Sequence, residues 1–277
     1  MNFVIYRVFL IPFEASLFPV TDEDKKRILS EEIFANVELR TPRGKQFAIR
    51  ILQVEDGAIL GKIAHMQIER IISKADTDFE PSDVENWPFI FFIFHAKTQT
   101  LVTEYKTSFQ SDYKYLGNSL SAAISEKLKP QGLEAKLTLI AEKTAFWAAI
   151  ERAEKIFSLR FKFHSPNMFG ASSNANQSLA QLRSLYNSTD SEIKLSNEAG
   201  KLKVDRNQLD SFVEYCDEGG GEWIIGKQDR NVPGKTSIRS QNSFIKFQID
   251  IDHGEIQNAV GSIVDAARKF FRLGNDD

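Results

Sequence analysis

The amino-acid sequence predicts an α+β protein with antiparallel hairpins in its N-terminal half, split β-α-β-like units in its C-terminal half and a C-terminal amphipathic helix. Three observations support this prediction. Asp56 and Gly57, a pair favoured in two-residue hairpin turns, separate two strand-like runs. A second pair of strand-like runs fills "WPFIFFIFHAKTQTLVTEYKT". From Asp112 onward, helical patterns alternate with single short strands.

The N-terminal half begins with a strand. Residues 2–11 are rich in β-branched and aromatic residues and end at Pro12, as expected of a buried strand. Thr21 is placed to cap a helix that continues to about Ala35, because acidic residues fill the first turn after it. Residues 76–86, between the two hairpins, are acidic and are expected to form a loop.

The C-terminal half is expected to alternate helices with strands. The predicted helices cover residues 112–128, 143–155, 177–186 and 206–216. The predicted strands cover residues 133–140, 156–164 and 191–196, and a strand or strand pair covers 236–252. In the last helix, apolar residues recur at helical spacing from Ile256 to Phe271. The change of pattern suggests two domains, residues 1–130 and 131–277, with one continuous sheet as the alternative.

The composition is that of an ordinary folded protein. Hydrophobic residues make up 42% and charged residues 26% of the 277 residues, enough to bury a core without disulfides or metals. The formal net charge of −3 excludes a protein that coats nucleic acid nonspecifically, because such binding needs a basic excess that releases counterions. The single cysteine, Cys216, excludes an internal disulfide framework and disfavours a cysteine zinc site. No cofactor is indicated.

No targeting or membrane segment is indicated by the sequence. The apolar N-terminal run is interrupted by Arg7 and lacks both a basic leader and a small-residue cleavage site. No other run has the unbroken apolar length of a membrane helix. Together with the cysteine usage, this pattern predicts a soluble protein of the reducing cytoplasm.

The stretch "DEGGGEWIIGKQ" matches the start of a nucleotide-binding P-loop. Gly221, Gly226 and Lys227 have the spacing of that motif, but Gln228 stands where Ser or Thr is needed. A second partial match, "DRNVPGKT", lacks the first glycine. The four residues between the glycines of the first match are strand-like, and strand-like residues follow the second, whereas a P-loop leads into a helix whose N-terminus faces the phosphates. We therefore interpret the glycines as structural, with the glycine run ending a helix.

The segment "SLRFKFHSPN" is the strongest candidate for a binding surface. Arg160, Lys162 and His164 alternate with apolar residues, so the three polar side chains share one face of a strand. A basic strand face can lie along a phosphate backbone while nearby aromatic residues stack on bases. Lys227 and Lys235 are candidate additional contacts to the same RNA or DNA. The alternative is the ordinary solvated face of a half-buried strand.

A metal-dependent nuclease is a second interpretation. Glu104 and Lys106 share a strand face downstream of Asp83, which matches an acid-x-Lys nuclease pattern. In such an enzyme the carboxylates hold magnesium, and the lysine polarises the attacking water or the phosphate. Glu134 and Lys136 form a rival copy of the same short pattern, which shows how readily it arises by chance. Whether the protein is an enzyme therefore stays open.

Metal-competent side chains are densest in "IDIDHGE". Asp250 and Asp252 would share one strand face and could converge on a cation. In the alternative, Asp252 caps the last helix and Glu255 completes a capping box. We favour the cap, and the four histidines lack the close spacing of a ligand set. No metal site is predicted.

Three segments, "WPFIFFIFHAKTQTLVTEYK", "LRFKFHSPN" and "GGGEWIIGK", occur in this order along most of the chain. In these segments the sequence resembles an uncharacterised bacterial family of domains of unknown function, found in mobile elements and anti-phage defence loci. The segments are hairpins and a strand–turn, not catalytic signatures. The resemblance therefore implies a bacterial defence setting and supplies no active site.

These observations predict a non-catalytic recognition protein that binds nucleic acid in a bacterial defence or toxin-like system. The alternatives are a metal-dependent nuclease and a protein–protein adaptor, the latter suggested by the 22 phenylalanines. Structure can discriminate among the three. A positively lined groove favours nucleic acid, convergent carboxylates in a pocket favour a nuclease, and exposed apolar area favours an adaptor.

Overall fold

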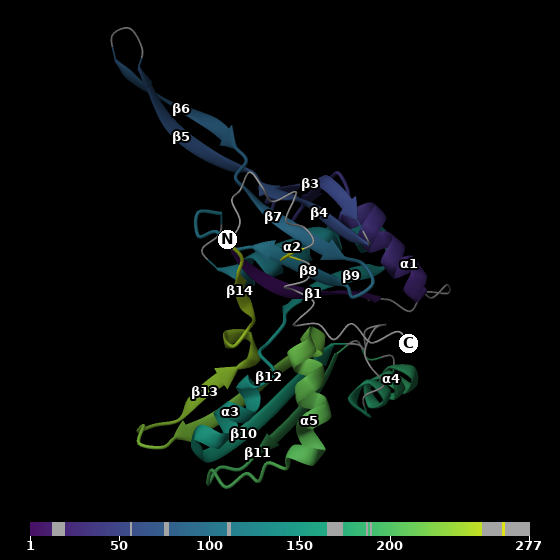
Figure 1. Ribbon diagram of the computed structural model, residues 1–277, viewed down its shortest axis with the longest axis vertical. Coiled ribbons are helices and arrows are strands. Elements are labelled where there is room, and N and C mark those ends of the chain that lie inside the picture. The colour runs from purple at the N-terminus through teal and green to yellow at the C-terminus, as the bar shows by residue number, and fades with distance from the viewer. Residues whose placement is uncertain are drawn as a thin grey trace.

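The computed structural model describes residues 1–12, 20–55, 57–74, 78–109, 112–164, 174–186, 188, 190–250 and 262–263. Its named strands form two larger antiparallel sheets and a separate two-stranded hairpin, and helices pack against the sheets (Figure 1). The protein is therefore mixed α+β, as predicted. No helix within these ranges is long and apolar enough to cross a membrane.

The first sheet contains eight strands. These are β1 (Asn2–Pro12), β2 (Val37–Arg40), β3 (Gln46–Glu55), β4 (Ala58–His65), β7 (Phe89–His95), β8 (Thr100–Glu104), β9 (Leu133–Leu139) and β14 (Lys246–Gln248). They pair in the order β14-β1-β8-β7-β4-β3-β2, and β9 also pairs with β1. The sheet thus takes strands from both sides of the boundary expected near residue 130, and the division into two domains stays a prediction.

Both predicted hairpins lie in this sheet. β3 and β4 pair up to Glu55 and Ala58, and Gly57 between them has φ 76°, a conformation that glycine adopts without steric cost. β7 and β8 pair from His95 and Thr100 inward. Local turn chemistry therefore selected the register of β3 and β4.

Helices cover one face of the first sheet. Thr21 caps α1 (Asp22–Arg27) through a reciprocal capping box with Asp24, as its position in the sequence indicated, and the π-helical turn η1 (Ile28–Ile33) continues it. α2 (Tyr113–Leu128) begins after Asp112, whose side chain accepts the Lys114 backbone N–H. These helices and the sheet enclose the largest core cluster, which includes Tyr6, Phe34, Phe47, Phe92, Phe94, Leu120 and Ile124.

The second sheet has the order β11-β10-β12-β13. Its strands are β10 (Ala153–His164), β11 (Asp190–Ser196), β12 (Gly221–Asp229) and β13 (Thr236–Arg239). β11 and β12 both run antiparallel to β10, so they are parallel to each other, and α5 (Arg206–Tyr215) connects them in a split β-α-β unit. The remaining elements are η2 (Lys129–Gln131), α3 (Ala145–Arg152), α4 (Asn174–Tyr186), η3 (Cys216–Gly220) and η4 (Ser240–Asn242). The predicted C-terminal helix lies outside the described residues.

The hairpin of β5 (Gln67–Lys74) and β6 (Phe79–Asn86) projects away from the first sheet, and we call it the arm (Figure 1). The prediction of a loop over residues 76–86 is wrong for residues 79–86, because β6 pairs with β5 along its whole length. All residues of β6 are exposed. Residues 79–86 are therefore acidic because they form a strand that is exposed to solvent, not because they form a loop.

Candidate binding surfaces

The predicted cationic face lies on β10, but acids from the neighbouring strands neutralise it. Arg160, Lys162 and His164 alternate along β10, as expected. Arg160 Nε–Glu192 Oε1 at 3.4 Å and Lys162 Nζ–Glu222 Oε1 at 3.2 Å are ion pairs, and His164 Nδ1 lies in a hydrogen bond with Asp190 Oδ1 at 2.7 Å. Cross-strand pairs of opposite charge stabilise a sheet, and they leave little net positive charge for a phosphate backbone.

The other two predicted contacts do not join this face. Lys227 is buried, and its Nζ lies 2.5 Å from Asp229 Oδ1 and 3.4 Å from the carbonyl oxygen of Ala149 in α3. Lys235 lies in the turn after β12, with its Nζ 4.1 Å from the centre of the Phe157 ring. Lys227 is thus part of the buried interior of the second sheet, and nucleic acid cannot reach its side chain.

The glycines of the P-loop-like stretch have structural roles, as interpreted from the sequence. Gly219 has φ 89° and lies in the turn that ends the α5 segment. Gly221 begins β12, and Gly226 lies within it, so a strand occupies the place where a P-loop needs a helix. A Cβ at Gly221 would lie 2.1 Å from the backbone oxygen of Lys162, which explains the glycine by close packing of two strands.

The structure brings Glu104 and Lys106 together but places Asp83, the other acid of the nuclease interpretation, on a different sheet. Asp83 lies on the arm, where its Oδ1 accepts a bond from Arg70 Nε at 3.0 Å. Glu104 lies in the first sheet and is 3% exposed, with Lys106 Nζ 3.1 Å from its Oε2. Among the described residues, no three His, Cys, Asp or Glu side chains form a group that could hold a metal ion.

Replacing Glu104 by alanine is expected to lower the free energy of unfolding by about 2–3 kcal/mol, because a buried carboxylate with two polar partners is removed. Its Oε2 accepts the Phe91 backbone N–H at 3.2 Å as well as pairing with Lys106. Urea denaturation of this variant beside Glu134→Ala, a half-buried acid of the rival pattern, measures the effect. Equal stability of the two variants would contradict the structural role of Glu104.

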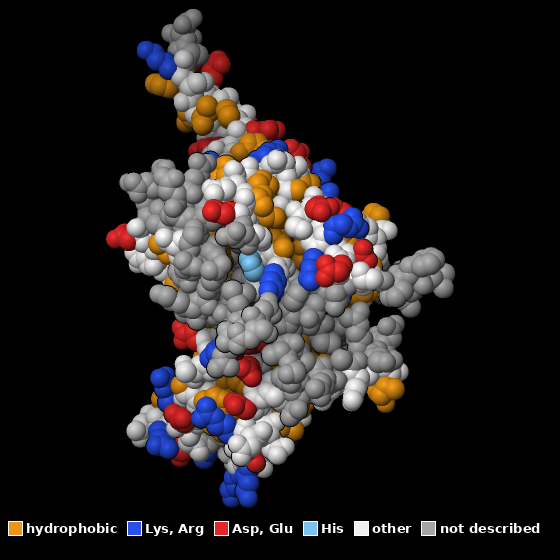
Figure 2. Space-filling view, turned by 45° about the vertical axis from the view of Figure 1, so that its right-hand side comes forward, with side chains coloured by type: hydrophobic (Ala, Val, Ile, Leu, Met, Phe, Trp, Pro, Cys, Tyr) orange, Lys and Arg blue, Asp and Glu red, His pale blue; other side chains and the backbone are white. Residues whose placement is uncertain are grey.

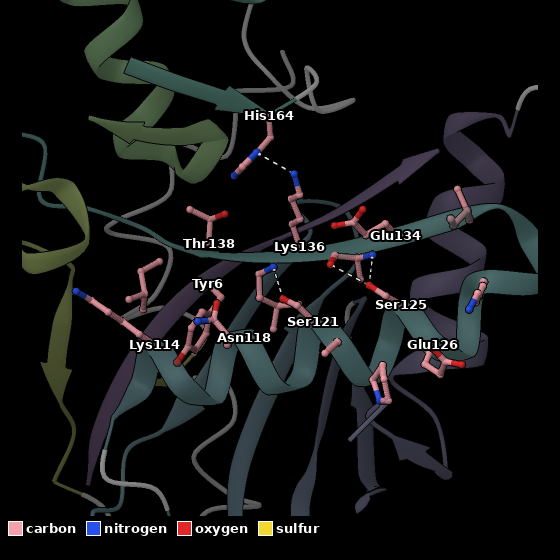
Figure 3. Close-up of a pocket in the computed structure, with 18 of the residues that line it drawn as sticks. Tyr6, Lys114, Asn118, Ser121, Ser125, Glu126, Glu134, Lys136, Thr138 and His164 are labelled. Carbon is pink, nitrogen blue, oxygen red and sulfur yellow. Dashed lines mark hydrogen bonds between the residues drawn. The ribbon is translucent and has the colours of Figure 1, made fainter. Parts of the chain in front are cut away.

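A cleft of about 700 Å³ lies between α2 and β9 and reaches His164 of β10 (Figure 3). Two serines of α2 form its floor. Ser121 Oγ accepts the Leu137 N–H at 2.9 Å, and Ser125 Oγ accepts the Ala135 N–H at 2.9 Å. These hydroxyls bond to the edge of β9 that faces away from β1, so this edge is already occupied.

The charges that line the cleft are nearly balanced. Three lysines line it, Lys114, Lys129 and Lys136, together with the acids Glu126 and Glu134. Lys114 Nζ donates to the neutral Asn242 Oδ1 at 2.7 Å, whereas Lys136 Nζ pairs with Asp190 Oδ1 at 2.8 Å. The cleft is therefore polar without being strongly positive. Its lysines come from segments that the sequence analysis did not place near one another.

His164 joins the cleft to the second sheet. Figure 3 shows Lys136 directed from β9 toward the His164 ring, and Asp190 Oδ1 lies within hydrogen-bonding distance of both side chains. Burial lowers the pKa of His164, while its bond to Asp190 acts in the opposite direction. The three side chains form one polar junction between the two sheets. The alternating pattern of β10 in the sequence could not reveal this role of His164.

The arm carries the densest exposed apolar surface of the described chain. Seven of the exposed large apolar residues lie on the arm or at its base: Ile68, Ile71, Ile72, Phe79, Val84, Trp87 and Phe89. Figure 2 shows such side chains along the arm at the top of the molecule. Ile72 is 70% and Phe79 69% exposed, and large apolar side chains exposed to this extent on one element mark an interaction site. The sequence analysis missed this surface.

Comparison with known proteins does not assign the chain to a family. No family model matches the chain, and no curated protein matches it. The resemblance to a bacterial defence-associated family therefore stays a prediction, and function has to be argued from the surfaces above.

Proposed function

We propose that the chain is a non-catalytic recognition protein that binds a protein partner through the arm. The observation that carries this proposal is the exposed apolar surface from Ile68 to Phe89. Large exposed apolar side chains gathered on one element are typical of protein interfaces, where tryptophan and other aromatic residues contribute much of the binding energy. Of the three hypotheses from the sequence, the adaptor is the one that exposed apolar area favours.

The backbone of the arm supports the same proposal. Within the described chain β5 pairs only with β6, and the two strands form a sheet of their own. A two-stranded hairpin without packing on either face is marginally stable in water. A partner that covers the apolar side chains or adds a strand to a free edge would stabilise the arm.

Nucleic-acid recognition is the second candidate function, and the lysines of the cleft favour it. Lys114 and Lys129 line one continuous cleft, in which Lys114 bonds to the neutral Asn242, so the cleft is a better site for a phosphate backbone than the face of β10, where acids pair with the cations. In both proposals the setting is a bacterial defence or mobile-element locus and the protein acts in the cytoplasm. The nuclease interpretation has no comparable support from the geometry.

The adaptor proposal is tested by crosslinking from the arm. A photoreactive amino acid at position 72 is expected to capture a defined protein in the source cell, and the same group at the exposed position 198 is not. Phe79→Glu in the same chain should abolish the capture, because it places a charge in the apolar interface. Capture that is equal from both positions, or insensitive to Phe79→Glu, would refute the proposal.

The nucleic-acid proposal predicts salt-sensitive binding without cleavage. Labelled single- and double-stranded DNA and RNA at low salt, with magnesium or with chelator, provide the measurement. Lys129→Glu is expected to weaken binding at least tenfold, whereas Arg160→Glu, a charge reversal on the neutralised face of β10, is expected to change it less than twofold. A larger effect of Arg160→Glu than of Lys129→Glu would indicate that nucleic acid binds at β10. Magnesium-dependent cleavage would support the nuclease hypothesis instead.

A further inference from the structure

The turn between β2 and β3 carries three cations that no acid neutralises. Arg40 ends β2, and Arg43 and Lys45 lie in the turn that follows. Among the residues that the structure describes, no carboxylate lies within ion-pair distance of any of the three. Glu38, the acid of β2, pairs with Arg50 instead, with its Oε1 3.0 Å from Arg50 Nη2. We call Arg40, Arg43 and Lys45 the turn cations.

Hydrogen bonds across the turn hold the turn cations close together. The Thr41 backbone N–H donates to the Lys45 carbonyl oxygen at 2.9 Å, and the Lys45 N–H donates to Thr41 Oγ1 at 3.0 Å. Gly44, with φ 88°, donates its N–H to the Thr41 carbonyl oxygen at 2.9 Å. Arg40 Nη2 would lie 3.8 Å from a Cβ at Gly44, so its guanidinium group lies near the turn. A backbone fixed in this way lowers the entropic cost of binding a ligand.

Lys45 is an ammonium group that is partly removed from water without a counterion. Its Nζ lies 5.0 Å from the ring centre of Tyr115 and 5.1 Å from that of Phe47. The rings attract the ammonium through their π electrons. Burial nevertheless lowers the pKa of Lys45. An anion that binds beside such an ammonium stabilises its charged form, so this environment favours an anionic ligand over a neutral one.

The turn adjoins the cleft between α2 and β9. Pro42 of the turn lines the cleft, as do Lys114 and Asn118 of α2. Tyr115 follows Lys114 in the first turn of α2, and its ring is 56% exposed beside Lys45. The turn cations therefore extend the cationic lining of the cleft and add positive charge to a cleft whose own charges are nearly balanced.

We propose that the cleft and the turn cations together bind single-stranded nucleic acid, with backbone phosphates at the turn cations and a base stacked on Tyr115. Proteins that bind single strands combine a cationic groove with exposed aromatic rings. A cleft of about 700 Å³ has the size of a small-ligand pocket, which admits a few nucleotides of one strand but not the full width of a duplex. This inference rests on the nucleic-acid function proposed above as the second candidate, and it names the ligand class and a further part of the site.

Fluorescence anisotropy of a labelled single-stranded oligonucleotide with the full chain at low salt tests the role of the turn. Arg40→Glu/Arg43→Glu is expected to raise the dissociation constant about tenfold or more, because two exposed cations become acids. The matched control is Lys201→Glu/Lys203→Glu, which makes the same change of net charge at two exposed lysines before α5. Its effect should be less than about threefold. A duplex of the same sequence should bind about tenfold more weakly than the single strand.

Variants of Tyr115 and Lys45 separate base stacking from phosphate binding. Tyr115→Ala is expected to raise the dissociation constant about tenfold, whereas Tyr115→Phe, which keeps the ring, should stay within about twofold of the wild type. Tyr115→Ala should leave the salt dependence of binding unchanged. Lys45→Gln should reduce the slope of the logarithm of affinity against the logarithm of salt concentration by about 0.7, the value for one phosphate contact on a single strand.

Three outcomes would overturn the inference in distinguishable ways. Binding that Lys129→Glu weakens but Arg40→Glu/Arg43→Glu and Tyr115→Ala do not would confine nucleic acid to the cleft and remove the turn from the site. Equal affinity for the duplex would show that the ligand is not specifically single-stranded. A wild-type chain that binds no nucleic acid at low salt would refute this inference together with the second candidate function, and the crosslink from position 72 would still test the arm.

Discussion

Asp217→Asn is expected to gain about 3 kcal/mol of stability relative to the wild-type protein as the pH is raised from 5 to 8. Asp217 is 2% exposed in η3, and its Oδ1 accepts the indole N–H of the fully buried Trp223 at 2.8 Å. Burial raises the pKa of this carboxyl to about 7, more than the Trp223 bond and Lys143 lower it. Asparagine keeps the acceptor for Trp223 and cannot ionise.

The sign follows from proton binding. In the unfolded chain an aspartate releases its proton near pH 3.8, whereas the folded Asp217 keeps it to about pH 7. Between these values the folded state binds more protons, so the free energy of unfolding of the wild type falls as pH rises. The loss is about 1.4 kcal/mol per pH unit and ends near pH 7, which gives roughly 3 kcal/mol above pH 5.

Urea denaturation of both proteins at pH 5 and pH 8 provides the measurement, and the difference between the proteins is the quantity that matters. His65 contributes the opposite slope, because burial lowers its pKa to about 4 and the unfolded chain then binds the extra proton. That contribution cancels between variant and wild type. Glu198→Gln is the control for loss of an exposed acid. A difference for Asp217→Asn that does not change with pH would contradict the prediction.

Much of the fold could be predicted because its signals are local. The turn at Gly57 set one hairpin, and Thr21 with Asp24 set the start of α1. Helices and strands of the C-terminal half lie close to the expected ranges because apolar periodicity changes at their boundaries. These elements can be predicted from residues that are close together in the sequence.

The candidate surfaces could not be predicted because distant segments decide them. Arg160 and Lys162 were expected to present positive charge, but Glu192 of β11 and Glu222 of β12 neutralise them once the sheet forms. Likewise, the cleft exists only because β9 pairs with β1 and α2 packs beside it. The arm was missed for a different reason. Its acidic residues suggested a loop, whereas they belong to a strand whose apolar residues face solvent, although apolar residues are usually buried.

Gly221→Ala is expected to lower the free energy of unfolding by at least about 3 kcal/mol, far more than Gly226→Ala. A Cβ at Gly221 would lie 2.1 Å from the backbone oxygen of Lys162 and 3.1 Å from the Cα of Phe163. Backbone atoms cannot rotate away, so β12 would have to separate from β10 and expose the core around Trp223. Backbone strain is not the cause, because φ at Gly221 is 176° and any residue adopts it.

Gly226 offers the matched comparison within the same strand. A Cβ there would lie 2.5 Å from Ser158 Oγ, but the next nearest atoms are 3.7 Å away. Rotation of the Ser158 hydroxyl relieves the contact, so we expect Gly226→Ala to cost about 1 kcal/mol or less. Denaturant unfolding of the two variants measures the difference. A phosphate-binding loop would need both glycines alike, so equal destabilisation accompanied by loss of nucleotide binding would show that the strand interpretation of "GGGEWIIGK" is wrong.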